Sequence, residues 1–178
     1  MKTKTNNYLI IKNLFLTVLF FFQISVNAQE KKLEDLSFLE LEHKIDSLFN
    51  TNGNALPLVK FYFKKSKKEN NLKALFYAYR YASQNPSENY KIKYSDSAIL
   101  VAKKINDNSI LAEAYLNKST LLFAKKQHDV ASNYLMLANK IAEKTNDDYL
   151  KYQTIYFIAQ NYLYLGQLSD AKKEYEKC

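Results

Sequence analysis

The sequence has few of the residues that turn-rich folds and phosphate-binding loops require. It contains two glycines, Gly53 and Gly166, and two prolines, Pro57 and Pro86, among 178 residues. Folds built from many short strands need more turn residues than this, and a phosphate-binding loop needs several closely spaced glycines. We therefore exclude turn-dense β folds and nucleotide-binding enzymes of the glycine-rich-loop type.

Cysteine and histidine are also scarce. The only cysteine is Cys178, and the two histidines, His43 and His128, lie far apart in the sequence. A single thiol cannot form an intramolecular disulfide or a thiolate metal cluster, and two separated imidazoles argue against a zinc site. Apolar residues make up 47% of the chain and charged residues 25%, which is enough to build a hydrophobic core. We expect an α-helical protein with no catalytic residues, no metal and no cofactor.

Residues 1–28 have the composition of a secretory signal peptide. Three lysines and no acidic residue precede an apolar block, residues 14–22. Residues 26–28 (Val-Asn-Ala) resemble a signal-peptidase site, so the mature chain would begin at Gln29. The apolar block is shorter than the roughly 20 residues of a spanning helix, which weighs against the alternative of an uncleaved anchor. We expect export to the periplasm or the extracellular space, with no membrane segment after cleavage.

The mature chain is moderately basic, because its net charge is +5 once three lysines have left with the signal peptide. Nearly all of the positive charge is lysine, and Arg80 is the only arginine. Recognition of bases and phosphates depends largely on arginine, whose planar guanidinium forms paired hydrogen bonds. The most basic cluster, residues 64–68, is typical of a solvated helix C-terminus, where cations interact favourably with the helix dipole. We therefore expect no nucleic-acid partner.

A short asparagine-rich motif recurs through the mature chain. Residues 68–71 (Lys-Glu-Asn-Asn) are followed 36 residues later by residues 104–107 (Lys-Ile-Asn-Asp), and 40 residues after that by residues 144–147 (Lys-Thr-Asn-Asp). Asn and Asp side chains form hydrogen bonds with nearby backbone and therefore favour turns and helix caps. Each copy predicts a corner between two helices.

A second recurring pattern is a small-large-small triad with the spacing i, i+4, i+7. This spacing puts three side chains on one stripe of a helix, where the small residues let a neighbouring helix approach and the large one fills the gap. The copies are Ser95/Ile99/Ala102, Ala131/Leu135/Ala138 and Ala171/Tyr175/Cys178, with a degenerate copy at Val59/Phe63/Ser66. A packed pair of helices is therefore the predicted repeating unit.

These patterns resemble the tetratricopeptide repeat (TPR). Nine residues after each corner asparagine comes another buried-type position, and in the third copy the match to the family pattern runs through Ile155, Ile158-Ala159, Tyr162, Leu165-Gly166 and the triad. The proline that usually closes each repeat is absent, and Pro86 predicts that the first helix of the first copy stops early. The resemblance implies an all-α fold, an α-solenoid of antiparallel helix pairs that forms a TPR-like superhelix. The expected parts are a degenerate hairpin at 29–71 and repeats at about 72–109, 110–148 and 149–178.

The last of these repeats stops within its second helix. Solenoid repeats contact only their neighbours, so an array that ended there would expose the stripe of Ala171, Tyr175 and Cys178. We expect either that the array continues in a longer protein or that a short protein associates with itself through this edge.

The resemblance also implies where a ligand would bind, because the first helices of such repeats line the inner face of the superhelix. Tyrosine and amide side chains can hold a peptide through apolar contact and hydrogen bonds, whereas packing between helices is their alternative role. Some family members bind a C-terminal carboxylate through basic residues and an asparagine. Arg80 and Asn117 match the first part of that clamp, but Gln153 and Phe157 replace its later cations. The expected inner-face residues are Tyr77, Arg80, Gln84, Glu113, Leu116, Asn117, Thr120, Gln153, Tyr156, Phe157 and Gln160.

Two local motifs have simple structural interpretations. Asp129 directly follows His128 between two predicted helices, where we expect it to be a helix N-cap. Asn117-Lys118-Ser119 is formally a glycan acceptor triplet, but it falls within a predicted helix and we assign it no role.

One helix could in principle hold a metal, since it carries Glu40, Glu42, His43 and Asp46. No second helix offers ligands of the same type, so a solvated polar face opposite Leu41 is favoured over a metal-dependent enzyme. We expect a non-catalytic module that binds a protein or peptide and forms the exported sensor or scaffold portion of a larger bacterial signalling protein. The main alternative is a free-standing periplasmic scaffold or assembly factor.

Overall fold

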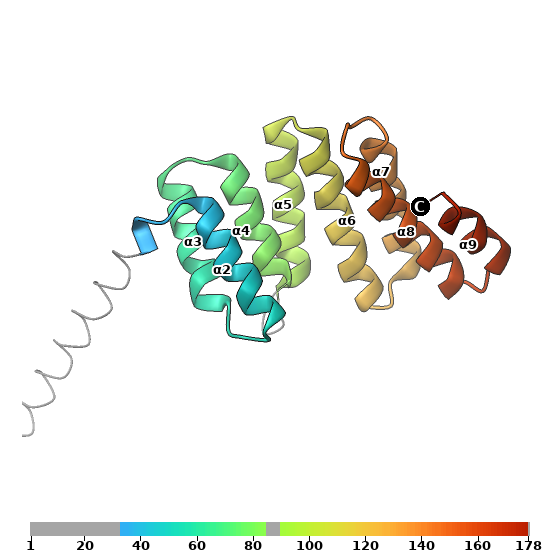
Figure 1. The fold of residues 1–178 in the computed structure, drawn as a ribbon, viewed down its shortest axis with the longest axis horizontal. Coiled ribbons are helices and arrows are strands. Elements are labelled where there is room, and N and C mark those ends of the chain that lie inside the picture. Colours follow the sequence, from blue (N-terminus) through green and yellow to red (C-terminus); the bar gives the residue numbers. More distant parts are fainter. Residues whose placement is uncertain (1–32, 85–89, 178) are drawn as a thin grey trace, which may run out of the picture. The chain divides into compact units, whose positions relative to one another are not determined.

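The computed structural model describes residues 33–84 and 90–177, which belong to two compact units. Every element in these residues is an α-helix, from α2 to α9 (Figure 1). The predicted all-α class is therefore confirmed for the described part of the chain. The signal peptide expected at residues 1–28 and the final position of the last triad, Cys178, lie outside the described residues. None of the described helices is both long and apolar enough to span a membrane.

The first unit, described over residues 33–47, contains most of α2 (Phe38–Asn50). A capping box begins this helix: the Ser37 hydroxyl and backbone N–H donate to Glu40 Oε2 at 2.7 and 2.8 Å, and the Glu40 N–H donates to Ser37 Oγ at 3.2 Å. The hydrogen bonds from Ser37 hold the pKa of the Glu40 carboxyl below its usual value. Leu41 and Ile45 are fully buried, four residues apart on one stripe of the helix.

The second unit, described over residues 48–84 and 90–177, consists of helices packed in chain order. Each helix from α3 to α9 contacts the next one, and α6 also contacts α8 (Figure 1). This order is compatible with the α-solenoid expected from the sequence. The helices are α3 (Leu56–Lys68), α4 (Leu72–Gln84), α5 (Lys91–Ile105), α6 (Asn108–Ala124), α7 (His128–Ala142), α8 (Asp148–Tyr164) and α9 (Leu168–Tyr175).

The three asparagine-rich motifs form the corners that precede α4, α6 and α8. Asn71 Oδ1 accepts from the Ala74 N–H at 3.0 Å, Asp107 Oδ1 accepts from Ser109 and Ile110 at 2.8 and 3.2 Å, and Asp147 Oδ1 accepts from Leu150 at 2.9 Å. These bonds satisfy N–H groups that have no partner inside the helix. The predicted corners, 36 and 40 residues apart, are therefore confirmed.

The turns inside two of the helix pairs depend on left-handed backbone. Gly166 has φ +74° in the turn between α8 and α9, and Lys126 has φ +60° in the turn between α6 and α7. In each turn the next residue, Gln127 or Gln167, donates its N–H to a carbonyl five residues earlier, at 3.0 and 2.9 Å. The tight turn predicted at residues 165–167 is confirmed.

The N-cap predicted at Asp129 is wrong. Helix α7 already begins at His128, and its N-cap position is Gln127, whose side chain makes no capping bond. The backbone reversal at Lys126 starts the helix earlier than the sequence suggested, so Asp129 lies in the first turn. A carboxylate there still interacts favourably with the helix dipole.

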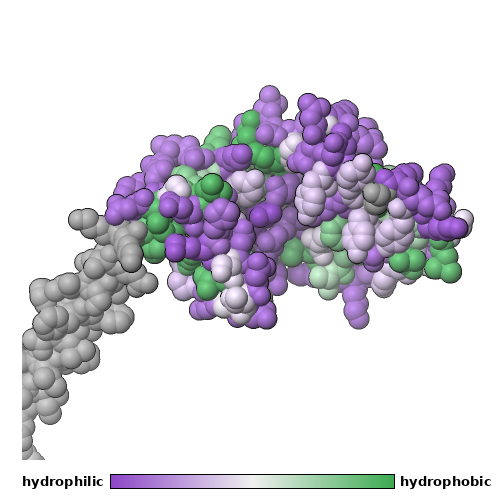
Figure 2. Space-filling model, in the orientation of Figure 1, coloured by the Kyte–Doolittle hydropathy of each residue, from purple (hydrophilic) through white to green (hydrophobic). Residues whose placement is uncertain are grey.

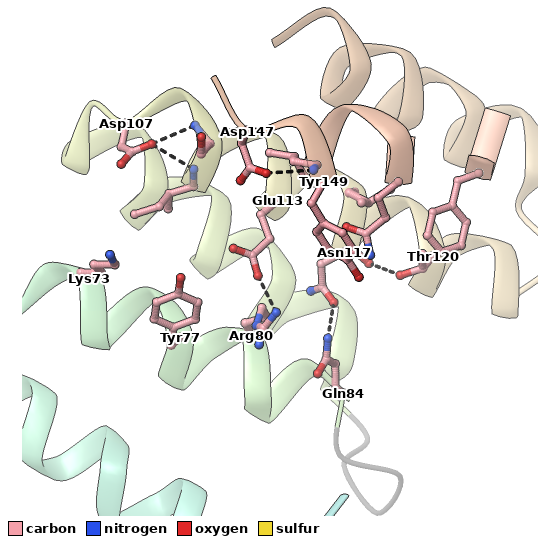
Figure 3. Close-up of a pocket in the computed structure, with 16 residues that line it drawn as sticks. Lys73, Tyr77, Arg80, Gln84, Asp107, Glu113, Asn117, Thr120, Asp147 and Tyr149 are labelled. Atoms are coloured by element: carbon pink, nitrogen blue, oxygen red, sulfur yellow. Dashed lines mark hydrogen bonds and ion pairs between the residues drawn. The ribbon is translucent and has the colours of Figure 1, made fainter. Parts of the chain in front are cut away.

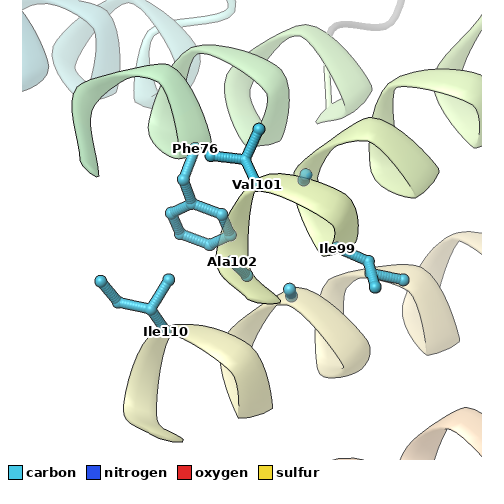
Figure 4. Packing of buried hydrophobic residues seen from close by; sticks show 7 residues of the cluster. Phe76, Ile99, Val101, Ala102 and Ile110 are labelled. Atoms are coloured by element: carbon cyan, nitrogen blue, oxygen red, sulfur yellow. The ribbon is translucent and has the colours of Figure 1, made fainter. Parts of the chain in front are cut away.

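The small-large-small triads form the packed core between helices. Ser95, Ile99 and Ala102 on α5 are buried, as are Ala131, Leu135 and Ala138 on α7, while Tyr175 on α9 is partly buried. Figure 4 shows one cluster, in which Phe76 of α4 and Ile110 of α6 lie beside Ala102. The positions predicted from the i, i+4, i+7 spacing are confirmed for the described residues.

Helix α4 is described to Gln84, and residues 85–89, where Pro86 predicts an early stop of this helix, lie outside the described part. Hydrophobic side chains are exposed near the end of the unit that carries α8 and α9 (Figure 2), among them Leu163, Leu165 and Leu168.

Candidate functional site

Helices α4, α6 and α8 surround an open hollow of about 590 Å³ in the second unit (Figure 3). Its lining comes from these three helices and from the capping residues Asp107 and Asp147. Each of the three helices begins at one of the asparagine-rich corners. Nine of the eleven expected inner-face residues line it: Tyr77, Arg80, Gln84, Glu113, Leu116, Asn117, Thr120, Gln153 and Phe157. The hollow is referred to below as the polar hollow.

Two of these residues are less accessible than the sequence suggested. We expected all eleven residues to be open to a ligand on the inner face, but Leu116 and Asn117 are only 5% and 7% exposed. Helix α6 contacts α5, α7 and α8, so it has a narrower free face than a helix with two neighbours. Leu116 and Asn117 therefore form the floor of the polar hollow, and more exposed side chains form its walls.

An ion pair between Arg80 of α4 and Glu113 of α6 crosses the polar hollow (Figure 3). Both side chains are about three-quarters buried, and the Arg80 guanidinium also lies over the rings of Tyr77 and Tyr81, at 5.3 and 5.1 Å from their centroids. The pair therefore links two helices that are not adjacent in the chain.

Burial and neighbouring charges shift the pKa values of both partners. Burial raises the pKa of the Glu113 carboxyl above its usual value, Arg80 opposes this shift, and the nearby Asp147 carboxylate adds to it. Burial alone would lower the pKa of Arg80, but Glu113 and the two tyrosines outweigh burial and raise it. Arg80 is therefore a permanent cation, and Glu113 is the group of this pair that can change charge. Within the described residues, Arg80 Nε is buried without a hydrogen-bond partner.

A chain of polar side chains fixes the floor next to this ion pair. Gln84 Nε2 donates to Asn117 Oδ1 at 3.2 Å, and Asn117 Nδ2 donates to Ser83 Oγ at 2.9 Å. The Ser83 hydroxyl donates to the Arg80 carbonyl at 2.7 Å, and the Thr120 hydroxyl donates to the Asn117 carbonyl at 2.9 Å. Each amide group is held in one orientation, so these groups would require little reordering when a ligand binds.

The rim of the polar hollow carries charges of both signs and an exposed aromatic ring. Lys73 lies on α4, while the capping carboxylates of Asp107 and Asp147 lie at the starts of α6 and α8. Tyr149, in the first turn of α8, is 77% exposed. The sequence identified Asp107 and Asp147 as parts of corners, but only the packing of the three helices shows that both corners border one hollow.

A second hollow, of about 430 Å³, lies beside α6, α7 and α8. It contains the two expected residues that do not line the polar hollow, Tyr156 and Gln160, and it shares Thr120 and Phe157 with that hollow. Sequence reasoning missed four of its residues, Phe123, His128, Asn161 and Tyr164. Phe123, Asn161 and Tyr164 follow Thr120, Phe157 and Gln160 at helical spacing, so extending the expected faces of α6 and α8 by one turn would have found them. His128 lies on α7, and only the packing of the helices brings it to this hollow.

The structure places the possible metal ligands of α2 in solvent. Glu40, His43 and Asp46 are exposed, and Glu42 is partly buried. Within residues 33–84 and 90–177, no three His, Cys, Asp or Glu side chains lie close enough together to hold a metal ion.

Comparison with known proteins adds no family to this description. No model of a known protein family matches the chain, and no curated protein is significantly similar to it in sequence.

Proposed function

We propose that this chain is a non-catalytic, TPR-like binding module that holds a protein or peptide segment along α4, α6 and α8. The observation that carries the proposal is the polar hollow itself. Hydrogen bonds between α4 and α6 fix its floor, and its rim carries the exposed ring of Tyr149 and charges of both signs. The amide groups of such a surface can form hydrogen bonds with a peptide backbone, and its ring and charges can contact the side chains of the peptide.

The state of Arg80 favours an internal segment over a free C-terminus as the ligand. A carboxylate clamp needs several cations that are available to the ligand, but Arg80 is already paired with Glu113, which leaves Lys73 as the other cation among the lining residues. The capping carboxylates Asp107 and Asp147 at the rim would also repel a terminal carboxylate. We therefore propose a segment that presents backbone amides and uncharged or basic side chains to this surface.

The place of this module in the cell is a further part of the proposal. Residues 1–28 have the pattern of an export signal, which supports a role outside the cytoplasm, as the sensor or scaffold portion of a larger signalling protein. A free-standing periplasmic scaffold is the alternative, and the exposed Leu163, Leu165 and Leu168 near α9 would then serve as an edge for association. Fusion of residues 1–28 to a reporter enzyme that is active only after export tests the localisation.

A displayed library of random 12-residue peptides tests binding directly. The full chain should enrich a defined set of peptides, and Tyr149→Ala should weaken their binding by about two- to tenfold through loss of ring contact. Tyr152→Ala is the matched control, because Tyr152 is another exposed tyrosine of α8 and lines neither hollow. Failure to enrich any peptide, or equal effects of the two substitutions, would contradict the proposal.

A further inference from the structure

The second hollow differs from the polar hollow in chemistry. Its lining includes four aromatic rings, those of Phe123, Tyr156, Phe157 and Tyr164, together with the imidazole of His128. The remaining lining residues are Thr120, Gln160 and Asn161, so none of its eight residues is Asp, Glu, Lys or Arg. We refer to it as the aromatic hollow. Such a lining suits a planar, uncharged group that can stack on rings.

Three polar atoms in this lining lack partners, whereas Thr120 donates to the Asn117 carbonyl and Gln160 donates to the Tyr175 hydroxyl. The His128 ring stacks on Tyr164, with centroids 3.8 Å apart and planes 24° from parallel, and it lies 5.5 Å from Phe123. Within the described residues, neither ring nitrogen of His128 has a hydrogen-bond partner, and Asn161 Oδ1 has none although its Nδ2 donates to Ser132 Oγ at 2.8 Å. Buried polar atoms usually have partners, so these three are available to a hydrogen-bonding group on a bound molecule.

The stacked tyrosine could give way to a ligand. Tyr164 is the last residue of α8 and is 62% exposed, so its ring has few protein contacts on its outer side. Rotation of this ring would uncover His128 and leave Phe123 and Phe157 in place as stacking surfaces. The pairing of Tyr164 with His128 also shows that an aromatic ring fits against this imidazole.

We infer that the aromatic hollow is a subsite for an aromatic side chain with a hydrogen-bonding group at its tip, a phenol or an indole, on the segment bound in the polar hollow. This inference rests on the proposed function and specifies the ligand further. Thr120 and Phe157 line both hollows, so one extended segment can occupy them together. The polar tip would pair with a ring nitrogen of His128, and the ring would stack on the aromatic lining.

Single amino-acid derivatives test this subsite separately from peptide binding. The probes are N-acetyl-tyrosinamide, N-acetyl-tryptophanamide, N-acetyl-phenylalaninamide and N-acetyl-leucinamide, each titrated into the full chain while NMR shifts are recorded. We expect the tyrosine and tryptophan probes to bind more tightly than the phenylalanine probe, and the leucine probe to bind most weakly. Tyr156→Ala should lower the affinity for the tyrosine probe by about two- to tenfold, and the control Tyr152→Ala should leave this affinity unchanged.

His128→Phe isolates the role of the polar atoms, because it keeps a ring and removes both nitrogens. This variant should bind the tyrosine and phenylalanine probes equally, and its melting temperature should equal or exceed that of the wild type since two unpaired buried atoms are gone. Equal binding of leucine and tyrosine probes, no effect of Tyr156→Ala, or an unchanged tyrosine preference in His128→Phe would overturn the inference. If the peptide library still gives binders sensitive to Tyr149→Ala, the proposed function survives that result.

Discussion

Lys126 and Gly166 occupy the same position of two turns that lie 40 residues apart, and both have left-handed backbone, with φ +60° and +74°. Glycine adopts this conformation without strain, whereas a residue with a Cβ atom does not. One copy of the repeat therefore has a favourable residue in its turn, and the other has an unfavourable one.

The first prediction follows from this difference. Lys126→Gly should stabilise the protein by about 1 kcal/mol, because relief of left-handed strain exceeds the entropy cost of glycine. Gly166→Ala should destabilise it by a similar amount, and no atom lies within 4 Å of the added Cβ, so the effect would come from the backbone alone. Urea unfolding of both variants measures this, and changes of the same sign would contradict the assignment of the two turns.

The second prediction concerns the cap at the start of α6. Asp107 accepts hydrogen bonds from the Ser109 and Ile110 N–H groups, so Asp107→Ala should cost about 0.5–2 kcal/mol of unfolding free energy. Asp107→Asn keeps the acceptor and removes the charge, and should recover most of that stability. If Asp107→Asn were as destabilising as Asp107→Ala in thermal unfolding, the charge of Asp107 rather than its capping hydrogen bonds would account for the loss of stability.

The third prediction concerns the pH dependence of the ion pair. The folded state raises the pKa of Glu113, so it binds this proton more tightly than the unfolded chain does. The contribution of Glu113 to stability should therefore be complete below the ordinary Glu pKa and should decline as the pH rises through its raised value. Glu113→Gln lacks this titration. The stability of the wild type relative to this variant should fall between pH 4 and pH 7 in urea unfolding, and a rise over that range would contradict the burial of the carboxyl.

Removal of the cation should strengthen this pH dependence. In Arg80→Ala the buried Glu113 carboxylate loses its partner, so its pKa should rise further and the protein should lose about 1–3 kcal/mol at pH 7. That loss should shrink at low pH, where Glu113 is protonated. The double variant Arg80→Ala/Glu113→Gln should be more stable at pH 7 than Arg80→Ala alone, and unfolding curves at both pH values provide the comparison.

The fourth prediction concerns a buried lysine. Lys118 of α6 is 5% exposed in its side chain, and its ammonium group lies 2.7 Å from Asp96 Oδ1 on α5. Asp96→Ala should cost about 1–3 kcal/mol because it leaves a buried cation without its carboxylate, whereas Lys118→Met should be nearly neutral. A double-mutant cycle on the unfolding free energy tests the coupling, and additive effects would contradict a direct pair.

The helix corners and the core could be predicted from the sequence because both depend on local patterns. Asn71, Asp107 and Asp147 cap helices through hydrogen bonds that span two or three residues, and the triads follow the helical period. Asp129 was misplaced because the preceding turn depends on left-handed backbone at Lys126, which no local residue pattern indicates.

The candidate site could be predicted only in part, for the same physical reason. The helical period and the resemblance to the TPR pattern predicted inner-face residues on α4, α6 and α8, and most of these residues line the polar hollow. The Arg80–Glu113 pair joins residues 33 apart, and His128 meets Tyr164 across 36 residues. Contacts of this kind depend on how the helices pack, so the sequence analysis named half of the residues of the aromatic hollow but did not predict a separate hollow beside α7.

The most direct test of the central claim is to map a library-selected peptide on the full chain by backbone NMR. If α4, α6 and α8 hold the segment, amide shifts should concentrate at residues that line the polar hollow, such as Thr120, Tyr149 and Gln153. The outer face of α5 and α7, represented by Leu100 and Met136, should change little. Shifts concentrated on α5 and α7, with none at the polar hollow, would show that the binding surface lies elsewhere and would contradict the account.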